Sequence, residues 1–312
     1  MVDTVHLKIP CDQLSESDLS SLMASLHNTS SNYNSWNEHV YSSGSLENMR
    51  VTIGSSFVKI KGSLTKFALG SNLESMGLSE YGSAIEKLQD ATHLKLHQAE
   101  LTRVDVGNNI NTLHEPRLYF PYLGESRNYQ RAQIDSSVYW KNGHVEVVMY
   151  DKVRELKSTA RKEGVRVQQT LDHTMRIEVR YKQRLCNRFN RPEVVLGSLV
   201  EPDFYLDLHN RWKSEYEAIQ KINTMEGLPK LLPSTPKEGI NAFTIYGLMQ
   251  MGLDNALHVV EVWKANGAFK RKEEYSRLKR MIKELYGSPN LTIESKLIKE
   301  LNDKVQNTNV YL

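Results

Sequence analysis

Tyr150 is the residue whose type and position most clearly suggest chemistry. It ends the segment 144–150, HVEVVMY, whose alternating apolar residues predict a β-strand with two different faces. Asp151 and Lys152 follow, and the charged segment 153–157 is predicted to continue as a helix. A tyrosine hydroxyl at a strand end, beside a lysine and an arginine, is a candidate nucleophile. Because the unperturbed pKa of a phenol is about 10, it needs activation at neutral pH. The alternative is a structural tyrosine with a packed ring.

Two further segments place acidic side chains on predicted strands. In AELTRVDVG, Asp105 falls among valines, where a carboxylate is costly unless it is paired or coordinated. In TMRIEVRYK, four apolar side chains point one way, and Arg176, Glu178 and Arg180 point the other. For Asp105 the sequence allows an ion pair with an arginine or a divalent cation. For the Arg-Glu-Arg face it allows an ion-pair ladder or a phosphate contact.

The other patterns predict an α+β protein, in which an antiparallel β-sheet with flanking helices is followed by a helical C-terminal region. Asn142-Gly143 is a strong hairpin signal between two alternating segments. Strands are predicted at 2–9, 51–60, 99–107, 136–140, 145–150 and 174–182, the second with a turn or bulge near Gly54. Helices are predicted at 17–26, 79–90, 194–200, 205–222, 240–251, 255–266, 271–286 and 293–305, and loops at 32–47 and 114–131.

Three polar segments have compositions that suit nucleic acid. Between 114 and 131 tyrosine and phenylalanine interleave with arginine, which suits unstacked bases and phosphates, or equally a packed loop. Lys59, Lys61 and Lys66 surround a strand edge, as a phosphate-contact strip or as a solubilising edge. The basic helix predicted at 271–286 leaves open DNA binding, dimerisation or contact with a host helicase.

Composition excludes several classes of protein. The 312 residues are 39% hydrophobic and 25% charged, an ordinary globular mixture for one large or two medium domains. No apolar run approaches about 18 residues, and MVDTVHLKIP lacks a basic segment followed by an apolar one. Neither a transmembrane helix nor a signal peptide is therefore expected. With only Cys11 and Cys186, the sequence predicts a reducing cytosol rather than a disulfide framework or a zinc site.

The net charge of +3 is unevenly distributed. Residues 151–191 contain twelve Lys or Arg against five Asp or Glu, a local charge of +7, so the rest of the chain sums to −4. Such a basic block indicates a polyanionic partner, nucleic acid rather than membrane, because no Trp-rich amphipathic segment accompanies it. A solvated basic face is the alternative.

Taken together, these segments resemble a known family. The blocks are LTRVD at 101–105, VYW at 138–140 with MYDKVRE at 149–155, and RIEVR at 176–180. In order and approximate spacing they are similar to the rolling-circle replication initiators of filamentous phages and related plasmids, of the gene II and X type. More distantly, they are similar to plasmid initiators that lack a His-hydrophobe-His motif. The resemblance covers residues 50–215 well and the C-terminal helices loosely.

The resemblance implies an endonuclease chemistry with a role for each residue. Tyr150 would nick DNA, forming a 5′-phosphotyrosine and a free 3′-hydroxyl that primes a polymerase, and Lys152 stands at the family's Tyr-x-Lys spacing. Asp105 and Glu178 would bind Mg²⁺ or Mn²⁺. Since the sequence contains no His-x-His pair, unlike other rolling-circle enzymes, such a metal site rests on carboxylates.

The basic side chains around these residues would serve the same reaction. They would offset charge on the phosphate and lower the pKa of Tyr150. DNA contacts are expected from Arg103, Arg154, Arg176, Arg180 and Lys182. The implied organisation is a nicking domain at 1–222, a linker at 223–239 and a helical region at 240–312.

The expected partner is single-stranded or supercoiled origin DNA in the cytoplasm of a prokaryotic host cell, with no membrane contact. A host helicase, a host polymerase and a homodimer are left open, as is the choice between a phage and a plasmid origin. Two other functions fit the same residues. One is an origin- or nucleic-acid-binding protein without catalysis. The other is a tyrosine transposase or relaxase acting on a different DNA element.

Overall fold

The computed structural model describes residues 1–33, 38–163, 173–222, 233–287 and 295–308. The chain divides into two compact units. Unit 1 comprises Met1–Arg117, Ser126–Ala218 and Lys304–Leu312, and unit 2 comprises Leu118–Glu125 and Ile219–Asp303. The domain boundaries expected from the sequence stay a prediction.

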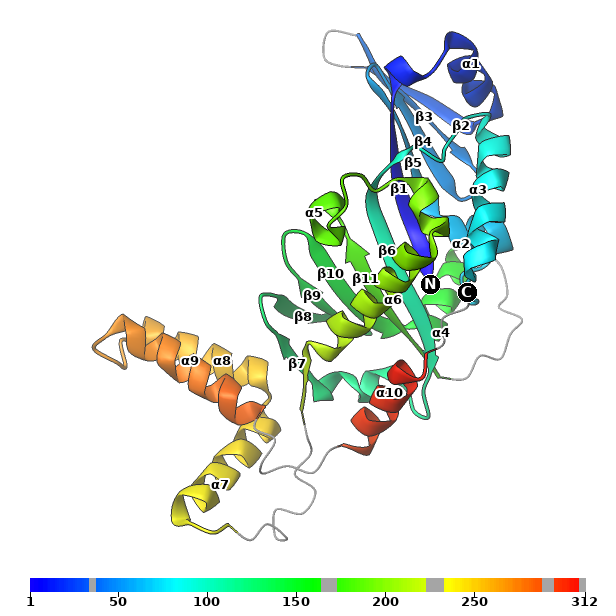
Figure 1. Ribbon diagram of the computed structural model, residues 1–312. Coiled ribbons are helices and arrows are strands. Elements are labelled where there is room, and N and C mark those ends of the chain that lie inside the picture. Colours follow the sequence, from blue (N-terminus) through cyan, green and yellow to red (C-terminus); the bar gives the residue numbers. More distant parts are fainter. Residues whose placement is uncertain (34–37, 164–172, 223–232, 288–294, 309–312) are drawn as a thin grey trace. The chain divides into compact units, whose positions relative to one another are not determined.

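Unit 1 is built on an antiparallel sheet, which has ten strands in the described part of the chain. Their order is β2-β3-β4-β5-β1-β6-β11-β10-β9-β8 (Figure 1). The bounds are β1 Val2–Pro10, β2 His27–Tyr33, β3 His39–Leu46, β4 Met49–Gly54, β5 Phe57–Ser63, β6 Glu100–Asn111, β8 Gln130–Ile134, β9 Ser137–Lys141, β10 Val145–Asp151 and β11 Thr174–Tyr181. The first strand of the chain thus lies inside the sheet, and the predicted α+β class is confirmed.

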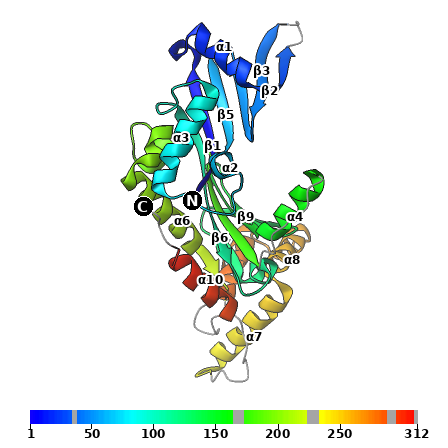
Figure 2. The ribbon, with the colours of Figure 1, turned by 90° about the vertical axis from the view of Figure 1, so that its right-hand side faces the viewer.

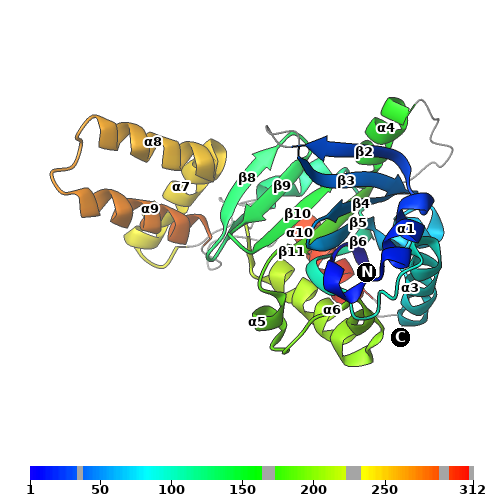
Figure 3. The ribbon, with the colours of Figure 1, turned by 90° about the horizontal axis from the view of Figure 1, so that it is seen from above.

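Helices cover one face of this sheet and leave most of the other open. Figures 2 and 3 show α1 (Glu16–Ser25), α3 (Leu78–Thr92) and α6 (Pro202–Glu217) on one side and α4 (Lys152–Glu163) on the other. The short helices α2 (Leu64–Leu69) and α5 (Leu185–Phe189) also belong to unit 1. On the covered face, strand side chains such as Val5, Ile60 and Val179 are fully buried. Successive strand residues point to opposite sides of the sheet. Burial of the apolar side chains on the covered face therefore places the alternate side chains on the open face.

The chain changes from strand to helix directly after Tyr150. The Asn142 side-chain oxygen closes the β9–β10 hairpin by accepting hydrogen bonds from the N–H groups of His144 at 2.9 Å and Val145 at 2.8 Å. β10 then runs to Asp151, whose Oδ1 accepts a hydrogen bond from the Arg154 N–H at 2.9 Å and so caps the first turn of α4. The predicted hairpin and the strand-end position of the tyrosine are both confirmed.

Unit 2 is helical apart from two short strands. β7 (Leu123–Ser126) pairs with β12 (Ile219–Lys221). The helices are α7 (Pro236–Met251), α8 (Leu253–Ala265), α9 (Lys272–Tyr286) and most of α10 (Lys296–Gln306). Their core includes Leu253, Val260, Tyr275, Ile282 and Tyr286. The helical C-terminal region is confirmed. Most of the predicted linker lies outside the described residues, and α7 already begins at Pro236.

Several local assignments from the sequence are wrong. Residues 32–47, predicted as a loop, include the end of β2 and all of β3. Their Ser, Asn and His side chains give no apolar alternation, yet the backbone pairs with β4. The turn predicted near Gly54 within 51–60 is present, and it separates two strands, β4 and β5. The predicted helix 205–222 ends at Glu217, before β12.

The predicted loop 114–131 contains β7 and the start of β8, and its aromatic side chains are packed. Tyr119 and Phe120 are fully buried, and the Tyr129 hydroxyl donates to Glu215 at 2.7 Å. This favours the packed alternative over base stacking. In the described ranges no helix is both long and apolar enough to cross a membrane.

Candidate active site on the open face of the sheet

β10, β11 and β6 are adjacent, and together they bring the predicted site residues onto the open face. Tyr150 lies opposite Arg176 in the β10–β11 pair. On the other side of β11, Arg180 lies opposite Asp105 of β6. Glu178 stands between the two arginines on the same face of β11. Tyr150, Glu178 and Asp105, which are far apart in the sequence, therefore share one surface.

The Tyr150 hydroxyl contacts Glu178. Its oxygen lies 3.5 Å from Glu178 Oε2. Burial raises the pKa of Tyr150, the negative charge of Glu178 raises it further, and the Arg176 guanidinium opposes both effects. Arg176 thus lowers the pKa of Tyr150, as expected of a neighbouring cation, but burial and the Glu178 carboxylate outweigh it, so the pKa is raised overall.

Glu178 is held between two arginines. Arg176 Nε donates to Oε2 at 3.2 Å, and Arg180 Nε donates to Oε1 at 2.7 Å. Arg176 is only 3% exposed and also donates to Asp3 Oδ2 at 2.7 Å and Asn109 Oδ1 at 3.1 Å. A buried guanidinium with this many partners is fixed in one place, so Arg176 positions Asp3 and Glu178. Its expected DNA contact stays a prediction.

Asp105 is bound by Arg103 of the same strand. Arg103 Nε and Nη2 each donate to one Asp105 oxygen at 2.7 Å. The Asp105 side chain is 3% exposed, whereas that of Arg103 is 25% exposed. Burial raises the pKa of Asp105 to about 6, Arg103 opposes this, and the charge of Glu178 adds to it. The ion pair that the sequence allowed for Asp105 is thus present, and the two carboxylates are close enough to repel each other.

A second cluster on the same face surrounds Glu146 of β10. This buried carboxylate accepts hydrogen bonds from Arg180 Nη1 at 2.6 Å and Lys182 Nζ at 2.5 Å, and Lys141 Nζ lies 3.7 Å away. Burial alone would raise the pKa of Glu146, but Lys182 and Arg180 hold it below its ordinary value. Arg180 thus bridges the carboxylates of Glu178 and Glu146, and both predicted DNA-contact residues already have an acidic partner.

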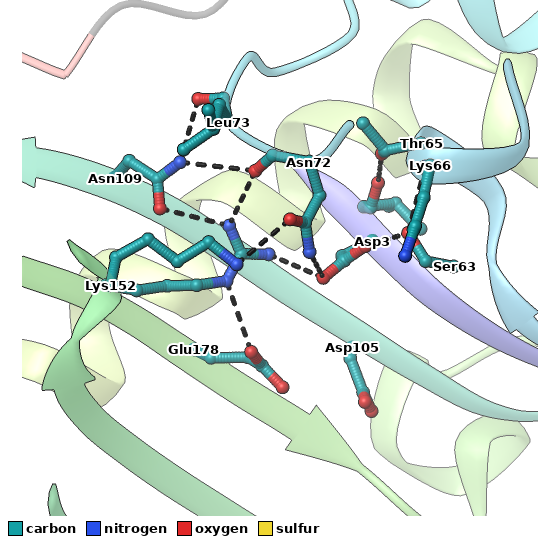
Figure 4. Close-up of polar contacts among 12 residues, drawn as sticks. Asp3, Ser63, Thr65, Lys66, Asn72, Leu73, Asp105, Asn109, Lys152 and Glu178 are labelled. Atoms are coloured by element: carbon teal, nitrogen blue, oxygen red, sulfur yellow. Dashed lines mark hydrogen bonds and ion pairs between the residues drawn. The ribbon is translucent and has the colours of Figure 1, made fainter. Parts of the chain in front are cut away.

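Lys152 is buried in the network around Arg176. It is 1% exposed, and its Nζ donates to Asn72 Oδ1 and to Glu155 Oε2, both at 2.9 Å. Asn72 in turn donates to Asp3 Oδ2 at 3.1 Å (Figure 4). The predicted catalytic role of this lysine stays a prediction, and its partners favour positioning the start of α4.

Two cavities border α4. The first, of about 530 Å³, lies against the open face of the sheet and is lined by Tyr139, Val148, Tyr150, Asp151, Arg154 and Arg180, among others. The second, of about 710 Å³, has mostly basic residues among its charged lining, namely Arg117, Arg154, Lys157 and Arg161 against Glu115 and Asp151, and His173 also lines it. The exposed Arg154 lines both cavities, so positive charge continues from the tyrosine along α4.

Comparison with known families gives one match, which covers most of the chain. The family model for the N-terminal part of the phage replication-associated protein, the gene II protein, matches residues 1–215, which include every predicted site residue. The chain belongs to this family of phage replication-associated proteins. The resemblance to gene II type initiators of filamentous phages is confirmed. No curated protein sequence matches the chain.

The donor chemistry of this replication-associated protein suits a hard divalent cation. Across the described residues, no group of three or more His, Cys, Asp or Glu side chains is arranged to hold a metal ion. Asp105 and Glu178 offer two carboxylates from adjacent strands, and their mutual repulsion would be relieved by Mg²⁺ or Mn²⁺. Arginines bind both carboxylates, so a cation would compete with Arg103 and Arg180.

Four residues of the polar network around Arg176 and Arg180 were not predicted from the sequence, namely Asp3, Asn72, Asn109 and Glu146. Asp3 and Glu146 carry the signal that identified Asp105, a carboxylate inside an alternating apolar strand. Asn72 lies outside the strands and carries no such signal. Only the packing of its segment beside Asp3 and Lys152 reveals it.

Proposed function

We propose that this protein is a site-specific DNA nickase and strand transferase that starts rolling-circle replication. Family membership supports a role in phage replication. The observation that carries the nicking proposal is the position of the Tyr150 hydroxyl, on the wall of a cavity that Arg154 and Arg180 also line, 3.5 Å from Glu178. The nucleophile and two cations thus line one space, together with Asp135, Asp151 and Glu155, and the carboxylate that would accept the proton lies beside the nucleophile.

In the proposed reaction, the Tyr150 oxygen attacks the phosphorus of the scissile phosphodiester in line with the 3′ oxygen. The bond between the tyrosine oxygen and phosphorus forms, and the bond between phosphorus and the 3′ oxygen breaks. The 3′ oxygen takes up a proton, which leaves a 5′-phosphotyrosine and a free 3′-hydroxyl. Because one phosphodiester replaces another, the reverse transfer rejoins the strand without an external energy source.

The chain supplies the proton acceptor and the positive charge. Tyr150 must lose its proton as the new bond forms, because its pKa is raised in the free protein. Glu178 Oε2 accepts the hydrogen bond from this hydroxyl and so is placed to take the proton. Arg180 and Arg154 line the same cavity and would offset the charge that grows on the phosphate oxygens.

Asp105 and Glu178 would hold the divalent cation. When bound, Mg²⁺ or Mn²⁺ would polarise the phosphate and neutralise part of its charge. Arg103 would have to release Asp105, and its partly exposed side chain leaves it free to turn toward solvent or toward a DNA phosphate. Arg103 would then exchange one anionic partner for another.

The proposed substrate is origin DNA, single-stranded or supercoiled, within the cytoplasm of a prokaryotic host cell. The exposed cations of α4, including Arg154, Lys157 and Arg161, would follow its backbone away from Tyr150. A host polymerase would extend the free 3′-hydroxyl and a host helicase would open the duplex ahead of it.

The test is covalent capture on DNA that contains the cognate origin. The protein is incubated with supercoiled and single-stranded origin DNA and Mn²⁺, and denaturation-resistant adducts are mapped by peptide. We expect the adduct on Tyr150, its loss in Tyr150→Phe and its persistence in Tyr139→Phe, since Tyr139 lines the same cavity and is the matched control. We expect EDTA, Asp105→Asn and Glu178→Gln to reduce it strongly.

Metal binding has a separate readout. Mn²⁺ is expected to raise the melting temperature of the wild-type protein and not that of Asp105→Asn. An adduct on another tyrosine would preserve the reaction class and refute the assigned nucleophile. Tight, salt-sensitive binding without any adduct would refute nicking and favour a non-catalytic origin-binding protein.

A further inference from the structure

The N-terminal half of the sheet has an unusual charge pattern. β2, β3, β4 and β5 contain Arg50, Lys59 and Lys61 and no Asp or Glu, and their remaining polar side chains are mostly Ser, Thr, Asn and His. Hydroxyl and cationic side chains are the groups that proteins use to contact phosphate oxygens. This part of the sheet therefore has the composition of a polyanion-binding surface.

Four cations from β1, β4 and β5 lie together on the open face. Lys8 pairs across the strands with Lys59, and Arg50 pairs with Lys61. The ammonium groups of Lys8 and Lys59 lie 5.7 and 4.4 Å from the centre of the Phe57 ring, which places these side chains on one side. Arg50, Lys59 and Lys61 are exposed.

These cations lack acidic partners. Within the described ranges none of the four lies within 4.0 Å of a carboxylate oxygen, and Arg50 donates to the Ser43 hydroxyl at 3.2 Å. Their charge also affects a neighbouring histidine: burial, together with the charges of Arg103 and Lys61, lowers the pKa of His6 to about 4. Like charges so close together on one surface repel each other unless an anion is bound.

The cationic surface is continuous with the face that carries Tyr150. His6 of β1 pairs with Lys61 on one side and with Arg103 of β6 on the other. Arg103 binds Asp105, which lies opposite Arg180 of β11. One open sheet face therefore leads from the unpaired cations to the candidate nucleophile, within unit 1.

We propose that the surface formed by Lys8, Arg50, Lys59 and Lys61 binds the phosphate backbone of duplex DNA beside the nicking site. This deepens the proposed function and rests on it: the unit that cleaves one strand would hold the flanking double helix on the other half of its sheet. The helices of unit 2 are then not needed for this contact.

Two features favour duplex over single-stranded DNA. The cationic strands offer lysine, arginine and hydroxyl groups, but their one aromatic side chain on this face, Phe57, lies beneath two lysines rather than free for base stacking. Next to them, nearly all of the edge strand β2 is exposed, and its hydroxyl and amide side chains widen the surface that can contact phosphates. By contrast, the tyrosines of the α4 cavity suit an unpaired strand.

The test compares two triple variants of the full chain. One replaces Arg50, Lys59 and Lys61 by Gln. The matched control replaces three exposed cations of α9, Lys272, Arg277 and Lys283, by Gln, so that the net charge changes equally. Binding to a 40-base-pair duplex of mixed sequence is measured by fluorescence anisotropy at several salt concentrations, because backbone contacts do not require a particular sequence.

For the sheet variant we expect affinity to fall by roughly tenfold to a hundredfold at about 0.1 M salt. The slope of log affinity against log salt should become shallower by roughly 2 to 3, as three phosphate contacts are lost. The α9 variant should keep the wild-type slope. Melting temperatures establish that both variants are folded, which is expected because the substituted side chains are exposed.

Equal losses in both variants, or no loss in the sheet variant, would refute the proposal. An equal loss for a single-stranded oligonucleotide would also refute it, since the surface would then not be selective for duplex. Covalent capture with wild-type protein is run in parallel. If capture succeeds while the sheet variant binds duplex normally, the proposed surface fails and the nickase stands. If capture fails, the nickase itself fails.

Discussion

The two halves of the open sheet face use similar cations in opposite ways. On β6 and β11, Arg103, Arg176 and Arg180 are bound to carboxylates, and the network that includes Arg176, Asp3 and Glu178 is buried. On β1, β4 and β5, Lys8, Arg50, Lys59 and Lys61 have no carboxylate within reach in the described chain. The paired half fixes side chains in position, and the unpaired half presents charge to an anion.

This contrast follows from what each half is proposed to do. A nucleophile must sit within a fraction of an ångström of its productive position, so ion pairs that restrain the surrounding side chains serve catalysis. Binding to a phosphate backbone gains from free, hydrated charges, because each contact releases a counterion. The same amino-acid types thus have different roles, which are set by whether a carboxylate lies within reach of the cation.

The largest effect is expected from removing the buried guanidinium. Arg176→Met keeps most of the side-chain volume but leaves Asp3 and Glu178 buried without that cation, which should cost about 3–5 kcal/mol of unfolding free energy. Lys61→Met, on the unpaired half, should change stability by less than about 0.5 kcal/mol. Urea unfolding measures both. Similar midpoints for the two variants would show that the ion network is not the stabilising element.

The second-largest effect is expected on the nicking rate, and it distinguishes Glu178 from Glu146, the two carboxylates that Arg180 contacts. Glu178→Gln removes the proton acceptor and a proposed metal ligand, so nicking of origin DNA should slow by roughly 10²- to 10⁴-fold. Glu146→Gln removes the other partner of Arg180 but no contact with Tyr150, and should slow nicking by less than about tenfold. The measurement is the single-turnover nicking rate of each variant. If both rates fell equally, the cause would be the disturbed Arg180 rather than the lost Glu178 carboxylate.

The third effect is the pH dependence of stability. Burial raises the pKa of Asp105 to about 6 from an ordinary value of 3.8, so between these values the folded state binds the proton more tightly than the unfolded state. Stability should therefore fall as pH rises through this window, by on the order of 2 kcal/mol. Asp105→Asn should abolish this loss when unfolding is measured with EDTA at pH 4 to 7.

Glu146 is a control, because its pKa shift makes stability change with pH in the opposite direction. Its pKa is lowered by Lys182 and Arg180, so its stabilising contribution is present above its ordinary pKa and is lost as pH falls. Glu146→Gln should therefore destabilise the protein more at pH 7 than at pH 4. If Asp105→Asn behaved in this way too, its ion pair with Arg103 would outweigh its burial.

Much of the paired half could be predicted from the sequence. In the unpaired half, strands at 2–9 and 51–60 and a phosphate-contact strip with Lys59 and Lys61 could be predicted, but the strands β2 and β3 could not. Regular apolar alternation defined the strands that carry Asp105, Tyr150 and Glu178. A carboxylate among valines marked Asp105 as unusual, and the Arg-Glu-Arg face marked Glu178. β2 and β3 escaped prediction because serine, asparagine and histidine give no periodic apolar signal.

The contacts of Arg176 could not be predicted from local pattern at all. They depend on β1 lying next to β6, and on Asn72, which precedes α3, approaching both Asp3 and Lys152. Such long-range pairing leaves no trace in the spacing of one segment. The sequence could therefore identify the candidate nucleophile and its acidic neighbours, but not the buried network that fixes them in place.

The smallest effect tests the comparison with single substitutions. Lys61 is exposed and has no acidic partner among the described residues, whereas Lys182 donates to Glu146 at 2.5 Å and is partly buried. If both bind duplex DNA freely, removing either should make the salt dependence shallower by about 0.9. We expect this change for Lys61→Gln and clearly less for Lys182→Gln, because the Lys182 charge is already neutralised by Glu146. Dissociation constants at four salt concentrations resolve the difference. Equal slopes would mean that Lys182 contacts DNA despite its hydrogen bond to Glu146. The two halves of the sheet would then differ only in where their cations lie.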